Sequence, residues 1–306
     1  MKKILIFYAS YGGGHLSAAR SIKEYLENNY PDYEISLVDC VKYINNALNR
    51  VSTTAYNEMA KKVPWAWGKL YTKSESGVIA KVSSASNKIL SFKLNKLLQD
   101  FEPDLIISTH FFGSQMCSIL KKRGKIHATL ATVMTDYAPH EQWLMNSSMI
   151  DYFFVAHDGM KTALIERGID ENKIFATGIP LSNRFLKSYN KEEILNSLGL
   201  KMDKKTILFF AGGEYGLGKS TTYNILRTLA NDFSNIQVVA ISGKNEKMKK
   251  GFDYLVKQSK SEENIKVLDY TNKVPELMSI ADLVITKPGG LTTTESLASR
   301  TTDYCY

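Results

Sequence analysis

The stretch KKILIFYASYGGGHLSAARSIKEYLEN (2–28) decides the fold, because it joins an apolar run, three glycines and a helical pattern. The run KKILIFYAS (2–10) is continuously apolar, which is typical of a buried strand. After the glycines, apolar residues recur every three or four positions from Leu16 to Leu26, which predicts an amphipathic helix. A strand, a glycine turn and a helix in this order open an α/β domain.

Further apolar runs with polar ends follow the first helix and alternate with segments of helical spacing. They are EISLVDC (34–40), DLIISTH (104–110), ATLATVMTD (128–136), YFFVAHD (152–158) and KIFATGIP (173–180). This alternation predicts a doubly wound parallel sheet. Ligands of such sheets gather beyond the carboxyl ends of the strands, so the polar residues at those ends are the candidates for a site.

A second series of strands begins near Lys204, after a stretch at 181–203 that we interpret as a linker with one short helix. Its strands are TILFFAGG (206–213), IQVVAISG (236–243), IKVLDY (265–270) and DLVITKPGG (282–290). We therefore predict two domains, at 1–180 and 204–306. A doubly wound domain commonly has five or six strands, and 299–306 lack helical periodicity, so we expect the second domain to be truncated.

Composition limits the class of protein. At 306 residues with 44% hydrophobic content, the chain can fill two cores. Cys40, Cys117 and Cys305 are widely separated and form no CxxC pair, which argues against a disulfide framework or a zinc site and favours a reducing cytosol. The amino-terminal apolar run, of about eight residues, is too short for a signal sequence or a membrane span.

The net charge of +8 is concentrated in one region. Residues 42–99 contain ten Lys or Arg against Glu58 and Glu75, whereas the remainder is neutral. One interpretation is a solvated helical face, and the other is attraction to an anionic surface of lipid or nucleic acid. Trp65 and Trp67 favour the membrane interface, where amphipathic rings are stable.

The first glycine turn, Gly12–Gly14, is followed at once by His15. Glycines allow a ligand to approach the backbone closely, and the helix that follows favours an anion or an electron-rich oxygen at its amino terminus. The GxGxxG spacing of dinucleotide sites is absent. His15 is a candidate general base because its ordinary pKa lies near neutrality, and a capping or surface histidine is the alternative.

The second turn, GGEYGLGKS (212–220), allows two interpretations. Residues 213–220 satisfy GxxxxGK[ST], the phosphate loop of many nucleotide triphosphatases, for which Asp269 is the one candidate metal-binding aspartate at a strand end. Alternatively, the glycines hold a nucleotide diphosphate at a helix amino terminus without magnesium. Both interpretations predict phosphate binding.

A third turn, TKPGGLTTTE (286–295), combines glycines, hydroxyls and a helix start with Glu295 one turn inward. Backbone amides and hydroxyls can hold a diphosphate, and a carboxylate can accept hydrogen bonds from both hydroxyls of a ribose. This pattern favours a nucleotide-sugar site. An ordinary turn with a helix cap is the alternative.

Five motifs in this order resemble the processive diacylglycerol glucosyltransferases and plant monogalactosyldiacylglycerol synthases of glycosyltransferase family 28. They are YGGGHLSAA (11–19), TVMTDYAPHEQW (132–143), TGIP (177–180), AGGEYGLGKS (211–220) and ITKPGGLTTTE (285–295). The resemblance spans almost the whole chain. It implies the GT-B fold, with two Rossmann-like domains that bind the acceptor and the UDP-sugar respectively and face one cleft. The segment that contacts the donor sugar in the family has no counterpart in this sequence.

The resemblance also implies roles for particular residues. His15 corresponds to the histidine that activates the acceptor hydroxyl. The acceptor side is expected at Gly13, Gly14, His110, Asp136, His140 and Trp143. The donor side is expected at Gly212, Gly213, Gly216, Tyr270, Thr271, Pro288, Gly289, Gly290, Thr292 and Glu295. No metal site and no cofactor are expected, since no carboxylate cluster with metal spacing is apparent.

The function implied is inverting transfer of a hexose, glucose in the first instance, from a UDP-sugar to diacylglycerol or a glycosyl-diacylglycerol. The expected partners are the donor, the lipid acceptor and, through residues 42–99, an anionic membrane surface, but not nucleic acid. The expected location is cytoplasmic, peripheral on the inner face of the cell membrane. A P-loop nucleotide triphosphatase and an inactive lipid-binding fragment remain as alternatives.

Overall fold

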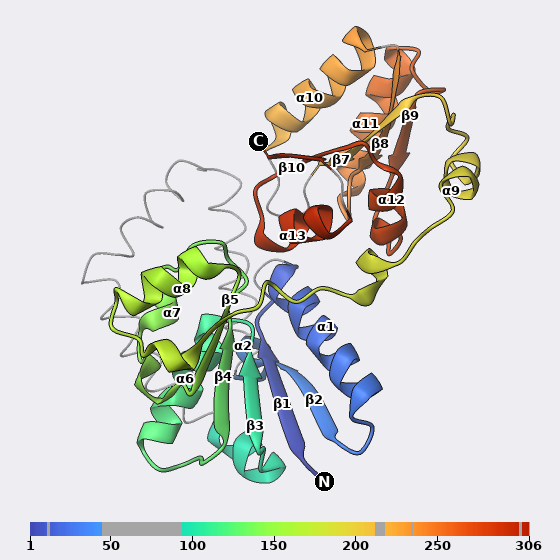
Figure 1. Ribbon diagram of the computed structural model, residues 1–306. Helices are drawn as coiled ribbons and strands as arrows, with labels where there is room; N and C mark the ends of the chain where they lie inside the picture. Colours follow the sequence, from blue (N-terminus) through green and yellow to red (C-terminus); the bar gives the residue numbers. More distant parts are fainter. Residues whose placement is uncertain (11–12, 45–93, 212–217, 234, 300–301, 306) are drawn as a thin grey trace. The chain divides into compact units, whose positions relative to one another are not determined.

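The chain forms two compact units, Met1–Ser182 and Asn183–Tyr306, in a computed structural model (Figure 1). The structure describes residues 1–10, 13–44, 94–211, 218–233, 235–299 and, as backbone, 302–305. Most of the basic region, residues 45–93, therefore lies outside the described residues. Both units are parallel α/β structures, so the predicted fold class is confirmed.

The first unit contains a six-stranded parallel sheet with the order β2-β1-β3-β4-β5-β6. Its strands are β1 (Lys3–Tyr8), β2 (Glu34–Asp39), β3 (Leu105–Ser108), β4 (Thr129–Val133), β5 (Tyr152–Val155) and β6 (Ile174–Ala176). Parallel strands that are buried on both faces form continuous apolar runs, which explains the pattern of residues 2–10. Because all six strands run in one direction, their carboxyl ends share one edge.

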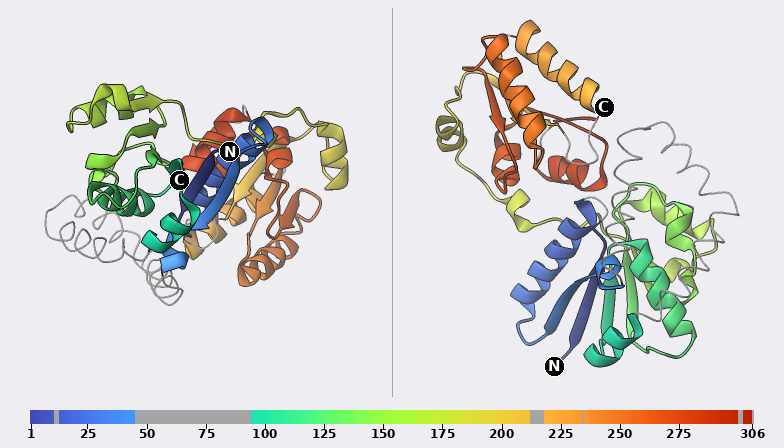
Figure 2. Two further views of the ribbon diagram at one scale, coloured as in Figure 1. Left: turned by 90° about the horizontal axis from the view of Figure 1, so that it is seen from below. Right: turned by 180° about the vertical axis from the view of Figure 1, so that it is seen from behind.

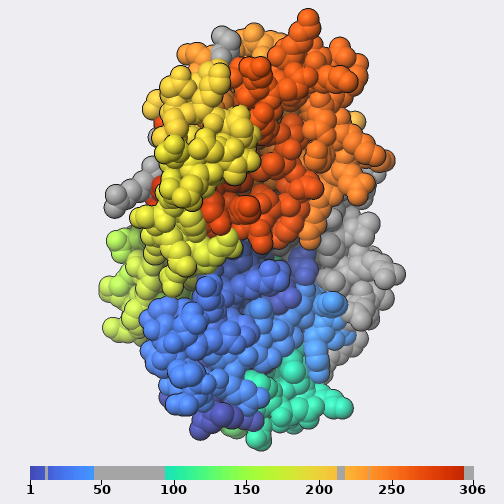
Figure 3. All heavy atoms as spheres, turned by 90° about the vertical axis from the view of Figure 1, so that its right-hand side faces the viewer, coloured from blue at the N-terminus to red at the C-terminus, as the bar shows by residue number. Residues whose placement is uncertain are grey.

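Helices cover both faces of this sheet (Figure 2). On one face, α1 (Gly14–Asn29) packs Ala19 against Ile4 and Ile6 of β1. This amino-terminal part of the chain is blue in the space-filling view of Figure 3. On the other face, the larger core contains Leu5 and Phe7, Leu94 and Leu98 of a helical segment at 94–101, and side chains of four further helices. These helices are α2 (Cys40–Ile44), α6 (Phe111–Lys122), α7 (Glu141–Leu144) and α8 (Asp158–Ile165).

The second unit contains a five-stranded parallel sheet with the order β11-β10-β7-β8-β9. Its strands are β7 (Lys205–Phe210), β8 (Ile236–Ile241), β9 (Ile265–Leu268), β10 (Leu283–Thr286) and β11 (Thr302–Cys305). Cores fill both faces. One contains α10 (Lys219–Asp232) and α11 (Glu246–Gln258), and the other contains α9 (Lys191–Ser197) and α12 (Val274–Ile280). The helix α13 (Gly290–Ala298) follows β10.

The number of strands in the second unit differs from the sequence interpretation. We expected four strands, but 302–305 form a fifth, β11, paired in parallel with β10. The residues Thr302–Cys305 lack helical spacing because they are a strand, and threonine and tyrosine favour strands. The stretch at 181–203, which we interpreted as a linker with one short helix, contains α9, and its Leu195 and Leu200 are buried in the core of the second unit.

Candidate active site

The carboxyl-terminal edge of the first sheet holds His15, the second residue of α1. Gly13 caps this helix with ordinary backbone angles (φ −83°, ψ −22°) and without a side-chain cap, and a Cβ built on it would meet nothing within 4 Å. Neither backbone strain nor crowding by the described residues therefore requires a glycine here. The open space lies beside the exposed amino terminus of α1, where a ligand can approach the backbone.

The imidazole of His15 is held through one nitrogen. Its Nδ1 lies 2.7 Å from the carbonyl oxygen of Thr109 and 2.9 Å from the hydroxyl of Thr135. Within the described parts of the chain, Nε2 has no hydrogen-bond partner. A carbonyl can only accept, so Nδ1 carries the proton and Nε2 presents a lone pair.

Two further histidines surround His15. The ring centroid of His110 lies 4.6 Å from that of His15, in an edge-to-face arrangement. His110 caps α6, since its Nδ1 accepts a hydrogen bond of 3.1 Å from the backbone N–H of Phe112. The ring of Phe111 then contacts both His110 and His140. The histidines thus belong to one packed cluster, in which His110 is a structural cap and almost fully buried.

Burial keeps all three histidines neutral. It lowers the pKa of His15, although Asp136 and the Thr109 carbonyl act in the opposite direction. Burial also holds the pKa of His110 well below its usual range, and the neighbouring His15 and His140 add to this effect. The pKa of His140 is lowered by burial against the attraction of Asp136. At neutral pH, His15 is therefore in the unprotonated form that a general base requires.

Asp136 links the cluster to the core. Its Oδ2 accepts a hydrogen bond of 2.9 Å from the indole N–H of Trp143 and lies 3.7 Å from Nε2 of His140. Trp143 is fully buried, so it contacts Asp136, Phe111 and His140 rather than solvent. Five of the residues expected at the acceptor side come together: His15, His110, Asp136, His140 and Trp143. Trp143 lies in the core and contacts Asp136 and His140.

In the second unit, the amino terminus of α13 lies beyond the end of β10. Gly289 caps this helix in an extended conformation and without a side-chain cap. A Cβ built on Gly289 would lie 3.8 and 3.9 Å from its nearest neighbours, which is ordinary van der Waals contact. Packing therefore does not require this glycine either. The first backbone N–H groups of α13, from Gly290 through Thr292, have no carbonyl partner within the helix and can bind an anion.

Glu295 lies on the same helix, half-buried, in surroundings that disfavour its charge. Burial raises the pKa of its carboxyl to about 7. A carboxyl in this state gains most from a ligand that donates hydrogen bonds to it, because such bonds favour the ionised form. The Glu295 carboxyl can therefore accept hydrogen bonds from a ligand that carries hydroxyl groups.

Tyr270 and Thr271 follow the end of β9. The phenol ring of Tyr270 is 62% exposed, and the Nζ of Lys244 lies 5.0 Å from its centroid. The hydroxyl of Thr271 accepts a hydrogen bond from the backbone N–H of Lys273. Tyr270 is thus an exposed aromatic residue just beyond the carboxyl end of β9, and a planar base can stack on such a ring.

The glycine loop after β7 is described only at its end. Gly212, Gly213 and Gly216 lie outside the described residues. Gly218 caps α10 with a φ of +87°, which favours glycine, and its carbonyl accepts a hydrogen bond from the Thr222 hydroxyl. Pro288 is exposed, and Thr292 is half-buried on α13.

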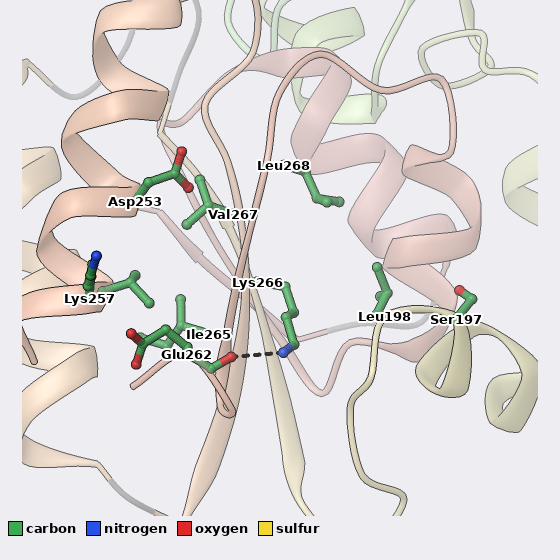
Figure 4. Close-up of a pocket in the computed structure, with 10 residues that line it drawn as sticks. Ser197, Leu198, Asp253, Lys257, Glu262, Ile265, Lys266, Val267 and Leu268 are labelled. Carbon is green, nitrogen blue, oxygen red and sulfur yellow. Dashed lines mark hydrogen bonds between the residues drawn. The ribbon is translucent and has the colours of Figure 1, made fainter. Parts of the chain in front are cut away.

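A groove of about 500 Å³ lies elsewhere in this unit, along the edge strand β9 (Figure 4). Asp253 and Lys257 of α11 line one side, and Leu198 lines the other. Lys266 on its floor donates a hydrogen bond to the backbone carbonyl of Glu262. None of the candidate residues lines this groove, so it is separate from the candidate site.

Within the described ranges, no group of three or more His, Cys, Asp or Glu residues is placed to hold a metal ion. In the same ranges, no helix is long and apolar enough to cross a membrane. The expectations of no cofactor and of a peripheral location stay predictions.

Two parallel α/β units of this kind are the components of the GT-B fold, which solved structures share. Anabaena HepE in complex with UDP and glucose superposes with a TM-score of 0.58 at 13% identity, over 100% of this chain and 80% of that chain. Staphylococcus aureus MnaA with UDP gives a TM-score of 0.62 at 13% identity, over 100% and 79%. These similarities concern the fold.

Sequence similarity gives the family. The profile of monogalactosyldiacylglycerol (MGDG) synthases matches residues 15–181, and that of the glycosyltransferase family 28 C-terminal domain matches residues 209–302. The chain is 33% identical over 302 residues to the processive diacylglycerol beta-glucosyltransferase of Staphylococcus aureus, covering 97% of this chain and 73% of the relative. The chain belongs to this family of glycosyltransferases, and the resemblance stated above is confirmed.

Sequence reasoning missed Thr109 and Thr135, which hold the imidazole of His15. Both occur at strand ends, beside the candidates His110 and Asp136. Their position at a strand end could have indicated a place in the site, but we assigned that place to the titratable residues next to them, His110 and Asp136. Phe111, which contacts His140 and Trp143, was missed for the same reason.

Proposed function

We propose that this protein transfers a hexose, glucose in the first instance, from a UDP-sugar to the hydroxyl of diacylglycerol or of a glycosyl-diacylglycerol. The proposal is supported by the relative that is 33% identical over almost the whole chain and is named a processive diacylglycerol beta-glucosyltransferase. The observation that carries the mechanism is the geometry of His15. A neutral imidazole whose protonated Nδ1 is anchored, and whose Nε2 has no hydrogen-bond partner among the described residues, is the arrangement of a general base.

In this mechanism, Nε2 of His15 removes the proton from the acceptor hydroxyl. The oxygen forms a bond to C1 of the sugar while the bond from C1 to the phosphate oxygen breaks, and UDP leaves with that electron pair. A single displacement of this kind inverts the configuration at C1. The proton rests on His15 as imidazolium, near the Asp136 carboxylate, whose charge favours the protonated form.

The donor is proposed to bind the second unit at residues that the sequence indicated. The diphosphate is assigned to the amino terminus of α13 at Gly289, Gly290 and Thr292, with Pro288 beside them, and to Gly212, Gly213 and Gly216, which lie outside the described residues. The helix amino terminus stabilises the charge that develops on the leaving diphosphate. Glu295 accepts hydrogen bonds from the ribose hydroxyls, and the uracil stacks on Tyr270 beside Thr271.

The acceptor is proposed to approach the first unit at Gly13 and Gly14. The open space at Gly13 leaves the backbone accessible beside His15. Asp136 and His140 form a polar margin, while His110 and Trp143 hold that margin in place. The basic region 42–99, most of which lies outside the described residues, is proposed to bind the anionic membrane surface in which the lipid acceptor resides.

The test is incubation of the chain with UDP-glucose and vesicles that contain diacylglycerol, followed by detection of glucosyl-diacylglycerol. ATP hydrolysis is measured in parallel, because residues 213–220 also fit a phosphate loop. The proposal predicts glycolipid from the wild type and from Lys219→Ala, in which the loop lysine is removed. Magnesium-dependent release of phosphate from ATP, lost in Lys219→Ala and without any glycolipid, would contradict it.

A further inference from the structure

Two threonines from neighbouring strands meet at one nitrogen of His15. Thr109 follows β3 and Thr135 follows β4, and both are buried, with exposures of 0% and 5%. The Thr109 carbonyl lies 2.7 Å and the Thr135 hydroxyl 2.9 Å from Nδ1 of His15. Because β3 and β4 are adjacent and parallel, their ends bring both oxygens to the same point.

Thr109 is also hydrogen-bonded to the backbone of His15. Its hydroxyl donates to the carbonyl oxygen of His15 at 2.8 Å and lies 3.3 Å from the carbonyl of Phe7. One residue therefore fixes the first turn of α1 through its side chain and the imidazole through its backbone. This double contact leaves the ring of His15 little freedom to rotate or change its tautomer.

The two oxygens have different chemistry. A backbone carbonyl only accepts hydrogen bonds, so at 2.7 Å it requires a proton on Nδ1. The Thr135 hydroxyl could donate to Nδ1 only if Nδ1 carried no proton. The lone pair of Nδ1 would then face the lone pairs of the Thr109 carbonyl oxygen at 2.7 Å, which is unfavourable. Both oxygens are therefore acceptors for the Nδ1–H, and both stabilise the imidazolium more strongly than the neutral ring.

Among the residues that the structure describes, no carboxylate is hydrogen-bonded to Nδ1 of His15. The charge of Asp136 acts to raise the pKa of His15. However, Oδ2 of Asp136 accepts a hydrogen bond from the indole N–H of Trp143 and lies 3.7 Å from Nε2 of His140. In histidine bases that are oriented by an aspartate, the carboxylate holds the Nδ1–H and stabilises the cation. The first unit places neutral oxygens at that position instead.

We infer that Thr109 and Thr135 are the positioning residues of the base, holding His15 as the Nδ1–H tautomer and stabilising its protonated form in place of a carboxylate. This inference rests on the proposed function for its catalytic meaning. Its structural part, the tautomer, holds independently of any substrate.

Thr135→Val tests the inference, because valine matches threonine in shape and removes the hydroxyl. Thr135→Ser, which keeps a hydroxyl, is the matched control. In the glucosyl-transfer assay, kcat of Thr135→Val should fall about tenfold, the loss of one hydrogen bond to a charged group, with KM for the lipid unchanged. Thr135→Ser should recover most of kcat.

The pH profile provides a readout that a general loss of packing would not give. Among the described residues, the titratable groups that act on His15 are His110, His140 and Asp136. They are unchanged in Thr135→Val, so a shift of the acid limb of kcat/KM reports on His15. Loss of an acceptor disfavours the imidazolium, and the limb should move to lower pH. An unmoved limb together with wild-type kcat overturns the inference.

Nitrogen NMR of the protein labelled with ¹⁵N-histidine separates this inference from the proposed function. The His15 signals are assigned by their loss in His15→Gln. The inference predicts a neutral ring with the proton on Nδ1 in the unliganded wild type, and a lower titration midpoint in Thr135→Val. A ring protonated on Nε2 contradicts it. If the wild type makes no glycolipid but has the Nδ1–H tautomer, the proposed function fails and the positioning of His15 stands.

Discussion

At the scale of residues, burial and partners decide what each titratable group can do. His15 and Glu295 lie in different units, and burial shifts both pKa values toward neutral forms. A neutral imidazole can accept a proton, and a carboxyl poised near neutrality responds to a ligand that donates hydrogen bonds. The two groups are thus suited to the acceptor hydroxyl and the ribose respectively.

Glu295 predicts a pH dependence of nucleoside binding. In the free protein its pKa is about 7, so it is protonated below and ionised above that pH. Ribose hydroxyls favour the carboxylate, which lowers the pKa in the complex, so affinity should rise with pH. Calorimetric titration with uridine, which has no phosphate to titrate, should show about tenfold tighter binding at pH 8 than at pH 6.

Glu295→Gln is the control for this prediction. Glutamine keeps the shape and cannot ionise, so uridine affinity should be weaker at pH 8 and should not change between pH 6 and pH 8. An equally steep pH dependence in the variant would show that another group titrates.

At the scale of elements, two helix amino termini carry glycines that the described residues do not require. Gly13 has open space around its Cβ position, and Gly289 has only ordinary contacts. Both also have negative φ. Each glycine lies at a helix amino terminus, and the free protein does not require it there. Such a glycine indicates that a ligand approaches the backbone closely.

Gly13→Ala and Gly289→Ala should therefore separate activity from stability. Each should change the free energy of unfolding by less than about 1 kcal/mol, since both backbone conformations suit alanine. Gly13→Ala should lower kcat/KM about a hundredfold by displacing the acceptor. Gly289→Ala should weaken UDP binding about tenfold, measured by calorimetry.

Gly168→Ala is the matched control in the first unit. Gly168 has open space but a φ of +84°, so alanine is strained there and should lower stability by about 1 kcal/mol without affecting kcat/KM. Wild-type activity in Gly13→Ala, or its global unfolding, would contradict the assignment of this turn to the acceptor.

The elements also show what the sequence could predict. Residues 2–28 predicted β1 and α1 because continuous apolarity and helical spacing are local signals. The strand β11 was missed because Thr302–Cys305 are short and were judged only against a helical pattern. Thr109 and Thr135 could not be assigned, since their bonds to His15 join residues 94 and 120 positions apart.

At the scale of the whole molecule, charge is segregated along the chain. Residues 42–99 carry the full net charge of +8, and the rest is neutral. A lipid acceptor stays in the bilayer, so an enzyme that uses it gains from a basic surface that binds anionic headgroups.

Replacing basic residues of this region with glutamine should weaken vesicle binding. Flotation with phosphatidylserine vesicles at low salt should show at least about tenfold weaker binding, because each lysine contributes about 1 kcal/mol. The variant replaces Lys61, Lys62 and Lys69. Its control replaces three lysines of α11, Lys247, Lys250 and Lys257. Equal binding by the two variants would contradict a membrane role for this region.

The central claim is that this protein is a glycolipid-forming glycosyltransferase with His15 as its base. The most direct measurement is the rate of glucosyl transfer from UDP-glucose to diacylglycerol vesicles by the wild type and His15→Gln, with UDP affinity measured for both. We expect product from the wild type, a loss of kcat of at least about a hundredfold in His15→Gln, and equal UDP affinity for the two proteins. Equal transfer rates for the two proteins, or no glycolipid from the wild type, would contradict it.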